Sequence, residues 1–74
     1  MTLDRLNIGD SGIIKDIHCD RMLKNRFYSF GLIKGAKIFV EEVTLARSTM
    51  EVKINTTKIA VRLSEASKIE LEDE

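Results

Sequence analysis

The chain has 74 residues, 43% of them hydrophobic and 32% charged, which is the size and composition of one small globular domain. Twelve Lys and Arg balance twelve Asp and Glu, and a domain with no net charge is a poor match to the phosphates of nucleic acid. One cysteine excludes an intrachain disulfide, and no apolar run approaches the roughly 20 residues of a membrane span, so we expect a cytoplasmic domain over residues 1–74.

The N-terminal residues predict one helical turn followed by a loop. In residues 2–7, Thr2 is placed to cap the turn, and Leu3 and Leu6 fall on one side of it. We expect these two leucines to cover one end of the core. Residues 7–12 contain two glycines with Asn, Asp and Ser, a composition that is typical of turns.

Residues 13–17 predict the first strand. Strict alternation would place Lys15 on the same face as two isoleucines and would bury its charge. If Ile14 and Ile17 point inward instead, the strand needs a β-bulge at Lys15 and Asp16, and we prefer this arrangement.

Asp20 is predicted to cap a helix that continues through Phe30. Leu23, Phe27 and Phe30 are spaced i, i+4 and i+7, which indicates an apolar stripe facing the core. Arg26 flanks this stripe, and a charged side chain in such a position is rarely left unpaired.

Residues 26–38 read as the end of the helix, a rigid connector and the start of a strand. Gly31 follows the last apolar helical position, where a residue in the left-handed conformation commonly ends a helix. Gly35 takes the third position of a type II turn over residues 33–36, which requires a positive φ. Gly31 and Gly35 are therefore structural residues, and the stretch has no feature of an active site.

Residues 36–44 predict the second strand, with Ile38 and Val40 facing inward and Phe39 outward. The alternation breaks at residues 41–43, as it would at a bulge or a sharp bend.

The C-terminal half predicts three further strands. Residues 45–49 form a loop, and apolar residues then alternate over residues 50–54 and again over residues 59–63, with a hairpin turn at residues 55–57. The inward-facing residues of these two strands are Met50, Val52, Ile54, Ile59, Val61 and Leu63.

A capped turn over residues 64–67 and a short last strand containing Ile69 and Leu71 complete the chain. The acidic residues from Glu70 to the end are expected to be solvated. Five short strands, each with one apolar face, satisfy their edges best by curling into a small barrel. The fold class is therefore mainly β, an SH3-like barrel with one α-helix inserted after the first strand. A five-stranded OB fold is the alternative, although its helix falls later in the chain.

His18, Cys19 and Asp20 form the one cluster with metal-binding character. Fe2+ or Zn2+ would be the ion bound there, although no cofactor is expected to be required. Zinc sites typically have four ligands, and three adjacent residues cannot all point at one ion. Such a site would need an acidic side chain from elsewhere or a second protomer. In the other interpretation, Asp20 caps the helix, Cys19 is a small buried residue and His18 is exposed.

No catalytic residue is assigned, because no nucleophile has a base beside it in the sequence and the chain has one histidine. With no Trp, one Tyr and three Phe, the chain is also poor in the aromatic residues of a proline-peptide groove. Tyr28 and Phe39 are the aromatic candidates for an exposed contact with a partner protein. Arg26, Arg62 and Glu65 either form a charge network that ties the helix to the barrel or contribute to a docking patch.

These residues resemble the ferrous iron transport protein A (FeoA) family, whose domain is also found at the C-terminus of iron-dependent repressors. The resemblance runs from Leu3 to Leu71, and its most specific part is the arginine and glycine segment between Arg26 and Ile38. One departure is that the loop over residues 45–50 lacks the proline that the family often has there. The remaining positions of the resemblance are Leu6, Gly9, Gly12, Ile14, Ile17, Leu23, Ile59, Ala60, Val61, Arg62, Glu65, Ala66 and Ile69.

The resemblance implies a non-enzymatic accessory protein that binds the cytosolic part of the Feo membrane iron importer and promotes ferrous iron uptake. It also implies an association with transition-metal binding. The alternative function is a metal-responsive regulatory domain that binds a transition metal ion. The chain is too short for the N-terminal DNA-binding and dimerisation part of the repressors.

Overall fold

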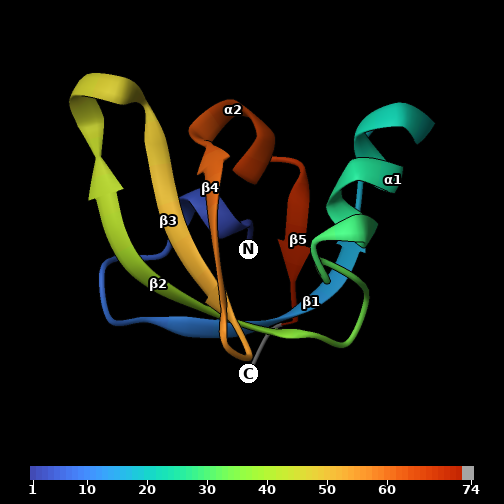
Figure 1. The fold of residues 1–74 in the computed structure, drawn as a ribbon, viewed down its shortest axis with the longest axis horizontal. Helices are drawn as coiled ribbons and strands as arrows, with labels where there is room; N and C mark the ends of the chain where they lie inside the picture. Colours follow the sequence, from blue (N-terminus) through green and yellow to red (C-terminus); the bar gives the residue numbers. More distant parts are fainter. Residues whose placement is uncertain (73–74) are drawn as a thin grey trace.

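A computed structural model describes residues 1–72, and a five-stranded antiparallel sheet organises this part of the chain (Figure 1). One α-helix, α1, follows the first strand, as the sequence predicts. Of the acidic C-terminal residues, Asp73 and Glu74 lie outside the described part. The elements in chain order are η1 (Leu3–Arg5), β1 (Ser11–Ile17), α1 (Arg21–Ser29), β2 (Lys37–Thr44), η2 (Leu45–Arg47), β3 (Thr49–Ile54), β4 (Thr57–Arg62), α2 (Leu63–Ala66) and β5 (Ile69–Leu71).

The sheet has the order β4-β3-β2-β1-β5 and curls because β1 changes its partner along its length. The first half of β1 pairs with β2, where Ser11 lies opposite Phe39. Its second half pairs with β5, where Ile17 lies opposite Ile69. The register shifts between Ile14 and Asp16, which confirms the predicted bulge and leaves Lys15 exposed.

The second predicted bulge is also present, because the register of β2 against β3 shifts between Val40 and Glu42. The hairpin from β3 to β4 is tighter than predicted, since Thr57 already pairs with Ile54 and only two residues form the loop. Asn55 has a φ of 56° in this loop, a conformation that Asn tolerates better than most residues.

Three local predictions are wrong in detail. The predicted loop at residues 45–49 instead begins with the short 3-10 helix η2 and passes through Ser48, which has a φ of 53°. Leu63 does not extend β4 but begins α2 and is only half-buried, because the backbone N–H of Arg62 donates to Glu65 Oε1 at 3.3 Å and starts the helix there. Thr2 precedes η1 but makes no capping bond to the backbone, because its hydroxyl donates to Asp4.

Helix α1 ends in a Schellman motif that depends on glycine. The N–H of Gly31 donates to Tyr28 O at 3.0 Å, and the N–H of Leu32 donates to Phe27 O at 3.0 Å. Gly31 has a φ of 91° and Gly35 a φ of 90°, so both predicted left-handed glycines are confirmed. Ala36 N donates to Ile33 O at 3.0 Å and closes the predicted turn over residues 33–36.

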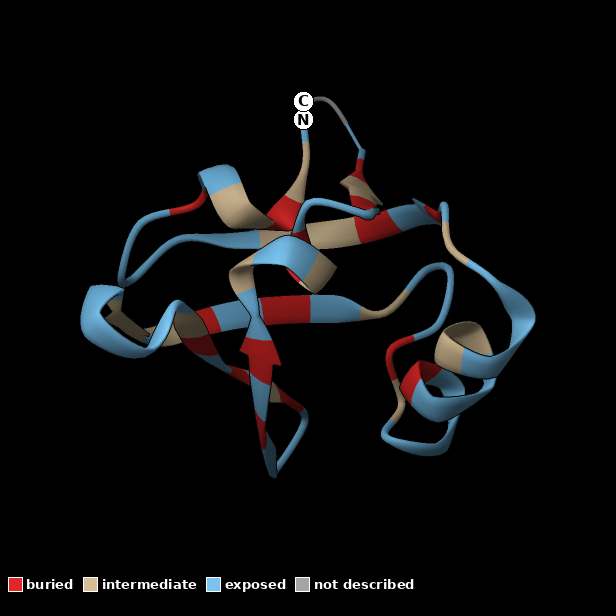
Figure 2. Cartoon of the chain, turned by 90° about the horizontal axis from the view of Figure 1, so that it is seen from above, coloured by how far each residue is buried: buried red, intermediate tan, exposed pale blue. Residues whose placement is uncertain are grey.

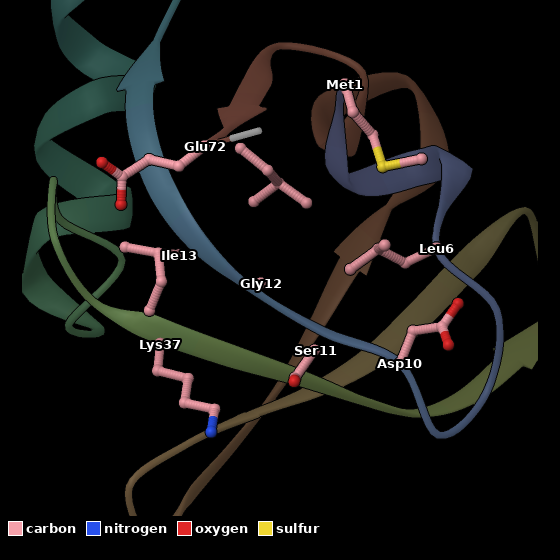
Figure 3. A pocket seen from close by; sticks show the side chains of 9 residues that line it. Met1, Leu6, Asp10, Ser11, Gly12, Ile13, Lys37 and Glu72 are labelled. Carbon is pink, nitrogen blue, oxygen red and sulfur yellow. The ribbon is translucent and has the colours of Figure 1, made fainter. Parts of the chain in front are cut away.

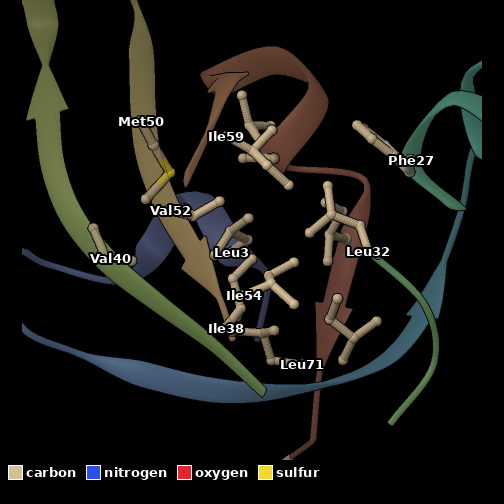
Figure 4. Packing of buried hydrophobic residues seen from close by; sticks show 14 of the residues in the cluster. Leu3, Phe27, Leu32, Ile38, Val40, Met50, Val52, Ile54, Ile59 and Leu71 are labelled. Carbon is tan, nitrogen blue, oxygen red and sulfur yellow. The ribbon is translucent and has the colours of Figure 1, made fainter. Parts of the chain in front are cut away.

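The core is formed mainly by the inner face of the sheet, with contributions from both chain ends (Figures 2 and 4). Leu3 and Leu6 cover it from the N-terminal turn, as predicted. Phe27 is the one buried residue of α1, and it packs at the edge of the core next to Leu32. The core residues are Leu3, Leu6, Ile14, Ile17, Phe27, Leu32, Ile38, Val40, Met50, Val52, Ile54, Ile59, Val61, Ala66, Ile69 and Leu71.

The predicted three-residue stripe on α1 is wrong at its last position. Phe27 is buried and Leu23 is half-buried against the core, but Phe30 is 44% exposed. The Schellman motif makes Phe30 the residue after the last helical one, and Leu32 takes the buried place beside Phe27. Within residues 1–72, no helix is long and apolar enough to cross a membrane.

Candidate functional site

His18 follows β1 directly, and its ring pairs with a residue from the far end of the chain. His18 Nε2 lies 2.7 Å from Glu70 Oε1, and Lys15 Nζ lies 3.5 Å from Glu70 Oε2. The hydrogen bond from His18, with the nearby charge of Lys15, lowers the pKa of the Glu70 carboxyl. The side chains of His18 and Lys15 are well exposed. The β1–β5 pairing therefore adds Glu70 to the neighbourhood of the predicted metal candidates.

Cys19 and Asp20 have structural partners. Asp20 Oδ1 accepts a hydrogen bond from Leu23 N at 2.8 Å, which confirms Asp20 as the N-cap of α1. Cys19 is half-buried against the core as a free thiol, and burial, together with the charge of Asp20, raises its pKa. Within residues 1–72, no three His, Cys, Asp or Glu side chains are grouped so that they could hold a metal ion.

The residues predicted to bind a partner are exposed or half-buried, but the structure does not bring them together. Arg26 and Tyr28 lie on α1, and Phe39 faces outward from β2. Arg62 and Glu65 lie where β4 meets α2. The candidates therefore lie in separate places, on α1, on β2 and where β4 meets α2.

The predicted charge network of Arg26, Arg62 and Glu65 is not formed among the described residues. Glu65 instead accepts from the backbone of Arg62 and contributes to the start of α2. Arg26 points into solvent from the last turn of α1, and α1 and α2 lie apart in both Figure 1 and Figure 2. The helical spacing predicted on which side of α1 Arg26 lies. It did not predict whether Arg26 reaches Glu65, because that depends on how α1 is placed on the barrel.

A partly open hollow of about 840 Å3 lies beside β1 and was not anticipated from the sequence (Figure 3). Met1 and Leu6 stand on one side of it, and Ile13 and Lys37 on the other. Ser11, on β1, is its one hydroxyl side chain, and no histidine lines the hollow. Its lining residues are Met1, Leu6, Asp10, Ser11, Gly12, Ile13, Lys37, Leu71 and Glu72.

The chain is similar to known proteins along nearly its whole length. The family model described as the FeoA domain matches residues 1–73. A chain from Campylobacter jejuni that is named as an Fe(2+) transport protein A is 35% identical over 71 residues, which are 96% of this chain and 96% of the relative.

Solved structures share the fold. The FeoA protein of Chlorobium tepidum superimposes with a TM-score of 0.89 and 27% identity, over 96% of this chain and 68% of that chain. FeoA of Stenotrophomonas maltophilia, solved with zinc and described as a prokaryotic SH3 domain protein, gives a TM-score of 0.82 at 22% identity, over 97% of this chain and 89% of that chain. The SH3-like fold class is thus confirmed.

A manganese-dependent transcriptional repressor gives a TM-score of 0.85 at 20% identity, over 93% of this chain and 39% of the repressor. The fold is therefore shared with part of a metal-dependent repressor, as the resemblance implied.

Proposed function

The chain belongs to the FeoA domain family, and on this basis we propose that it is a cytoplasmic, non-enzymatic accessory protein of ferrous iron uptake. In this role it binds the cytosolic part of the Feo membrane iron importer. The observation that carries the proposal is the match of the family model over residues 1–73, together with a relative named as an Fe(2+) transport protein that aligns over 96% of both chains. Iron is the cargo of the importer in this proposal, not a resident cofactor of the chain.

The chemistry of the described side chains supports a binding role. The thiol of Cys19 has a raised pKa, which disfavours the reactive thiolate. The ring of His18 is engaged by Glu70, and Ser11 has no histidine beside it in the hollow. A protein that acts by contact needs none of these groups to be activated, whereas covalent catalysis by a cysteine or serine nucleophile would need one.

A pull-down tests the proposal. The chain is mixed with the purified cytosolic domain of the Feo importer, with and without guanine nucleotide, and an unrelated SH3-like domain serves as the control. We expect specific retention of the chain. If the importer domain fails to retain it under both conditions, the proposed function is wrong.

A metal-responsive regulatory role is the second candidate, and the contact between His18 and Glu70 favours it. An exposed imidazole and a carboxylate 2.7 Å apart provide two donors on the protein surface. Zinc commonly takes four ligands, and no third His, Cys, Asp or Glu of residues 1–72 is grouped with these two, so water or a second protomer would have to complete the site. The Stenotrophomonas FeoA was solved with zinc, which supports testing this ion first.

Titration with Zn2+ or Fe2+, followed by amide NMR, separates the two candidates. Binding at this place should shift the amides around His18, and the shifts should disappear in His18→Ala and Glu70→Gln. The control variant is Lys58→Ala, which disrupts the ion pair between the exposed Lys58 and the half-buried Glu41 elsewhere on the sheet. Amides that stay unmoved around His18 would exclude the metal site.

A further inference from the structure

The charges of this neutral chain are unevenly distributed. Residues 21–37 contain five of the twelve Lys and Arg residues and none of the twelve Asp and Glu residues. This segment therefore has a net charge of +5, and the other 57 residues together have a net charge of −5. The segment comprises α1, the connector that follows it and the first residue of β2. The five basic residues are Arg21, Lys24, Arg26, Lys34 and Lys37.

No ion pair within residues 1–72 involves a basic residue of this segment. Within residues 1–72, the ion pairs that involve lysine join Lys15 to Glu70 and Lys58 to Glu41, and both lie outside the segment. Asp16 and Asp20 are acidic groups beside the segment. Asp20 caps α1, and the pKa of Asp16 is lowered first by the N–H of Ile17 and then by nearby positive charges that include Lys24 and Lys34. Arg21, Arg26 and Lys37 are exposed and form no ion pair with another residue of the described part of the chain.

The same segment also carries exposed apolar side chains. Met22 is 84% exposed, and Tyr28, Phe30 and Ile33 are each exposed by nearly half. These are four of the eight large hydrophobic residues that are exposed in the described part of the chain. Isolated exposed apolar residues are normal. Four of them within 17 residues that also contain five basic residues indicate an interaction surface.

Helix α1 is placed so that most of its surface is available. It lies at one end of the molecule, away from α2, in both Figure 1 and Figure 2. Among its nine residues, Phe27 is buried, and only Leu23 and Lys24 are half-buried. A nine-residue helix that buries so little has an unpartnered face.

We infer that residues 21–37 form the surface, here called the α1 surface, that docks an acidic segment with apolar side chains in the cytosolic part of the importer. This inference rests on the proposed function and adds the place and the chemistry of the contact. Charge complementarity selects an acidic partner, and Met22, Tyr28 and Phe30 supply apolar anchors. Aromatic residues, Met and Arg are the types that are enriched in protein interfaces.

A protein fits this surface better than an anionic membrane does. A helix that lies in a membrane interface needs a continuous apolar face turned toward the lipid. The buried Phe27 of α1 faces the core, and Asn25 and Ser29 are on its exposed side. The exposed apolar residues are instead interspersed with Arg26, which suits a partner that offers carboxylates and pockets together.

Charge reversal tests the inference. The double variant Arg21→Glu, Arg26→Glu changes two exposed charges on α1, and the matched control Arg5→Glu, Arg47→Glu makes the same change of net charge on η1 and η2. Calorimetric titration with the importer's cytosolic domain should show binding weakened by about tenfold or more for the α1 variant. The control should stay within about twofold of the unmodified chain, and wild-type binding should weaken as salt is raised.

An apolar pair of variants provides an independent measurement. Met22→Ser, Tyr28→Ser removes two anchors, and Ile8→Ser, Leu45→Ser removes two exposed apolar residues elsewhere. All four residues are exposed, so folding should be retained, and far-UV circular dichroism with a thermal melt verifies this. Weaker binding by the first pair and not by the second supports the α1 surface.

The outcomes separate this inference from the proposed function. If the unmodified chain binds the importer domain and both α1 variants bind it equally well, the α1 surface is wrong and the proposed function stands. If the unmodified chain does not bind, both fail. If phosphatidylcholine vesicles with one quarter phosphatidylglycerol retain the unmodified chain but not the charge-reversed variant, while the importer domain does not distinguish them, the surface binds membrane and the inference is overturned.

Discussion

Replacement of Gly31 by alanine should destabilise the domain through the backbone alone. Gly31 has a φ of 91°, and a Cβ atom built on it would meet Ile54 Cγ2 at 3.7 Å, which is an ordinary van der Waals contact. Space is therefore not the obstacle, and the cost comes from holding a side-chain-bearing residue in the left-handed region, about 1–2 kcal/mol. The smaller conformational entropy of unfolded alanine offsets about 0.4–1 kcal/mol of this.

The expected net loss is about 1 kcal/mol in the free energy of unfolding, measured by urea denaturation. For a domain of this size, this corresponds to a fall of roughly 4–8 °C in the melting temperature. Gly35 has a φ of 90° with no atom within 4 Å of its added Cβ, so Gly35→Ala should cost nearly the same. Gly31→Asn should cost less than Gly31→Ala, because asparagine tolerates this conformation. An unchanged urea midpoint for Gly31→Ala, or an asparagine variant less stable than the alanine variant, would refute the reasoning.

Three further predictions follow from single contacts. Asp20→Ala removes the bond to Leu23 N and should cost about 1 kcal/mol in urea denaturation, whereas Asp20→Asn should keep most of it. Phe27→Ala should cost about 3–5 kcal/mol, with Phe27→Leu much milder, and equal urea midpoints for the two would contradict the packing described for this residue. The folded-state pKa of Glu70 is lowered by His18, so its contribution to stability is present above about pH 4 and is lost as pH falls through the folded value. Glu70→Gln should therefore reduce the loss of stability between neutral and acidic pH. If the melting temperatures of the unmodified chain and of Glu70→Gln fall equally over that range, the pairing does not contribute to stability.

Features that depend on a few neighbouring residues were predicted well. Lys15 lies between isoleucines and predicts a bulge, because regular alternation would bury its charge. The register shift lies between Ile14 and Asp16, at the predicted place. Asp20 predicts a helix start because its carboxylate can reach the backbone N–H three residues later, and it does. The fold class follows from the number, length and apolar alternation of the strands.

The prediction that Phe30 faces the core was wrong because two local rules competed. The i, i+4, i+7 spacing favours a buried Phe30, but the Schellman motif at Gly31 ends the helix one residue earlier and turns Leu32 toward Phe27. The buried residue there is Leu32, and Phe30 remains 44% exposed.

The sequence by itself determined the strands, the bulges, the helix start and the two left-handed glycines, because each is decided by side chains and dihedral angles within a few residues. Only the tertiary structure decided which distant groups meet. Glu70 reaches His18 because β5 pairs with the second half of β1, and Arg26 misses Glu65 because α1 lies at one end of the barrel. The uneven charge is visible in the sequence, but it becomes a surface only because α1 buries little beyond Phe27 and leaves Arg21, Arg26, Met22 and Tyr28 exposed.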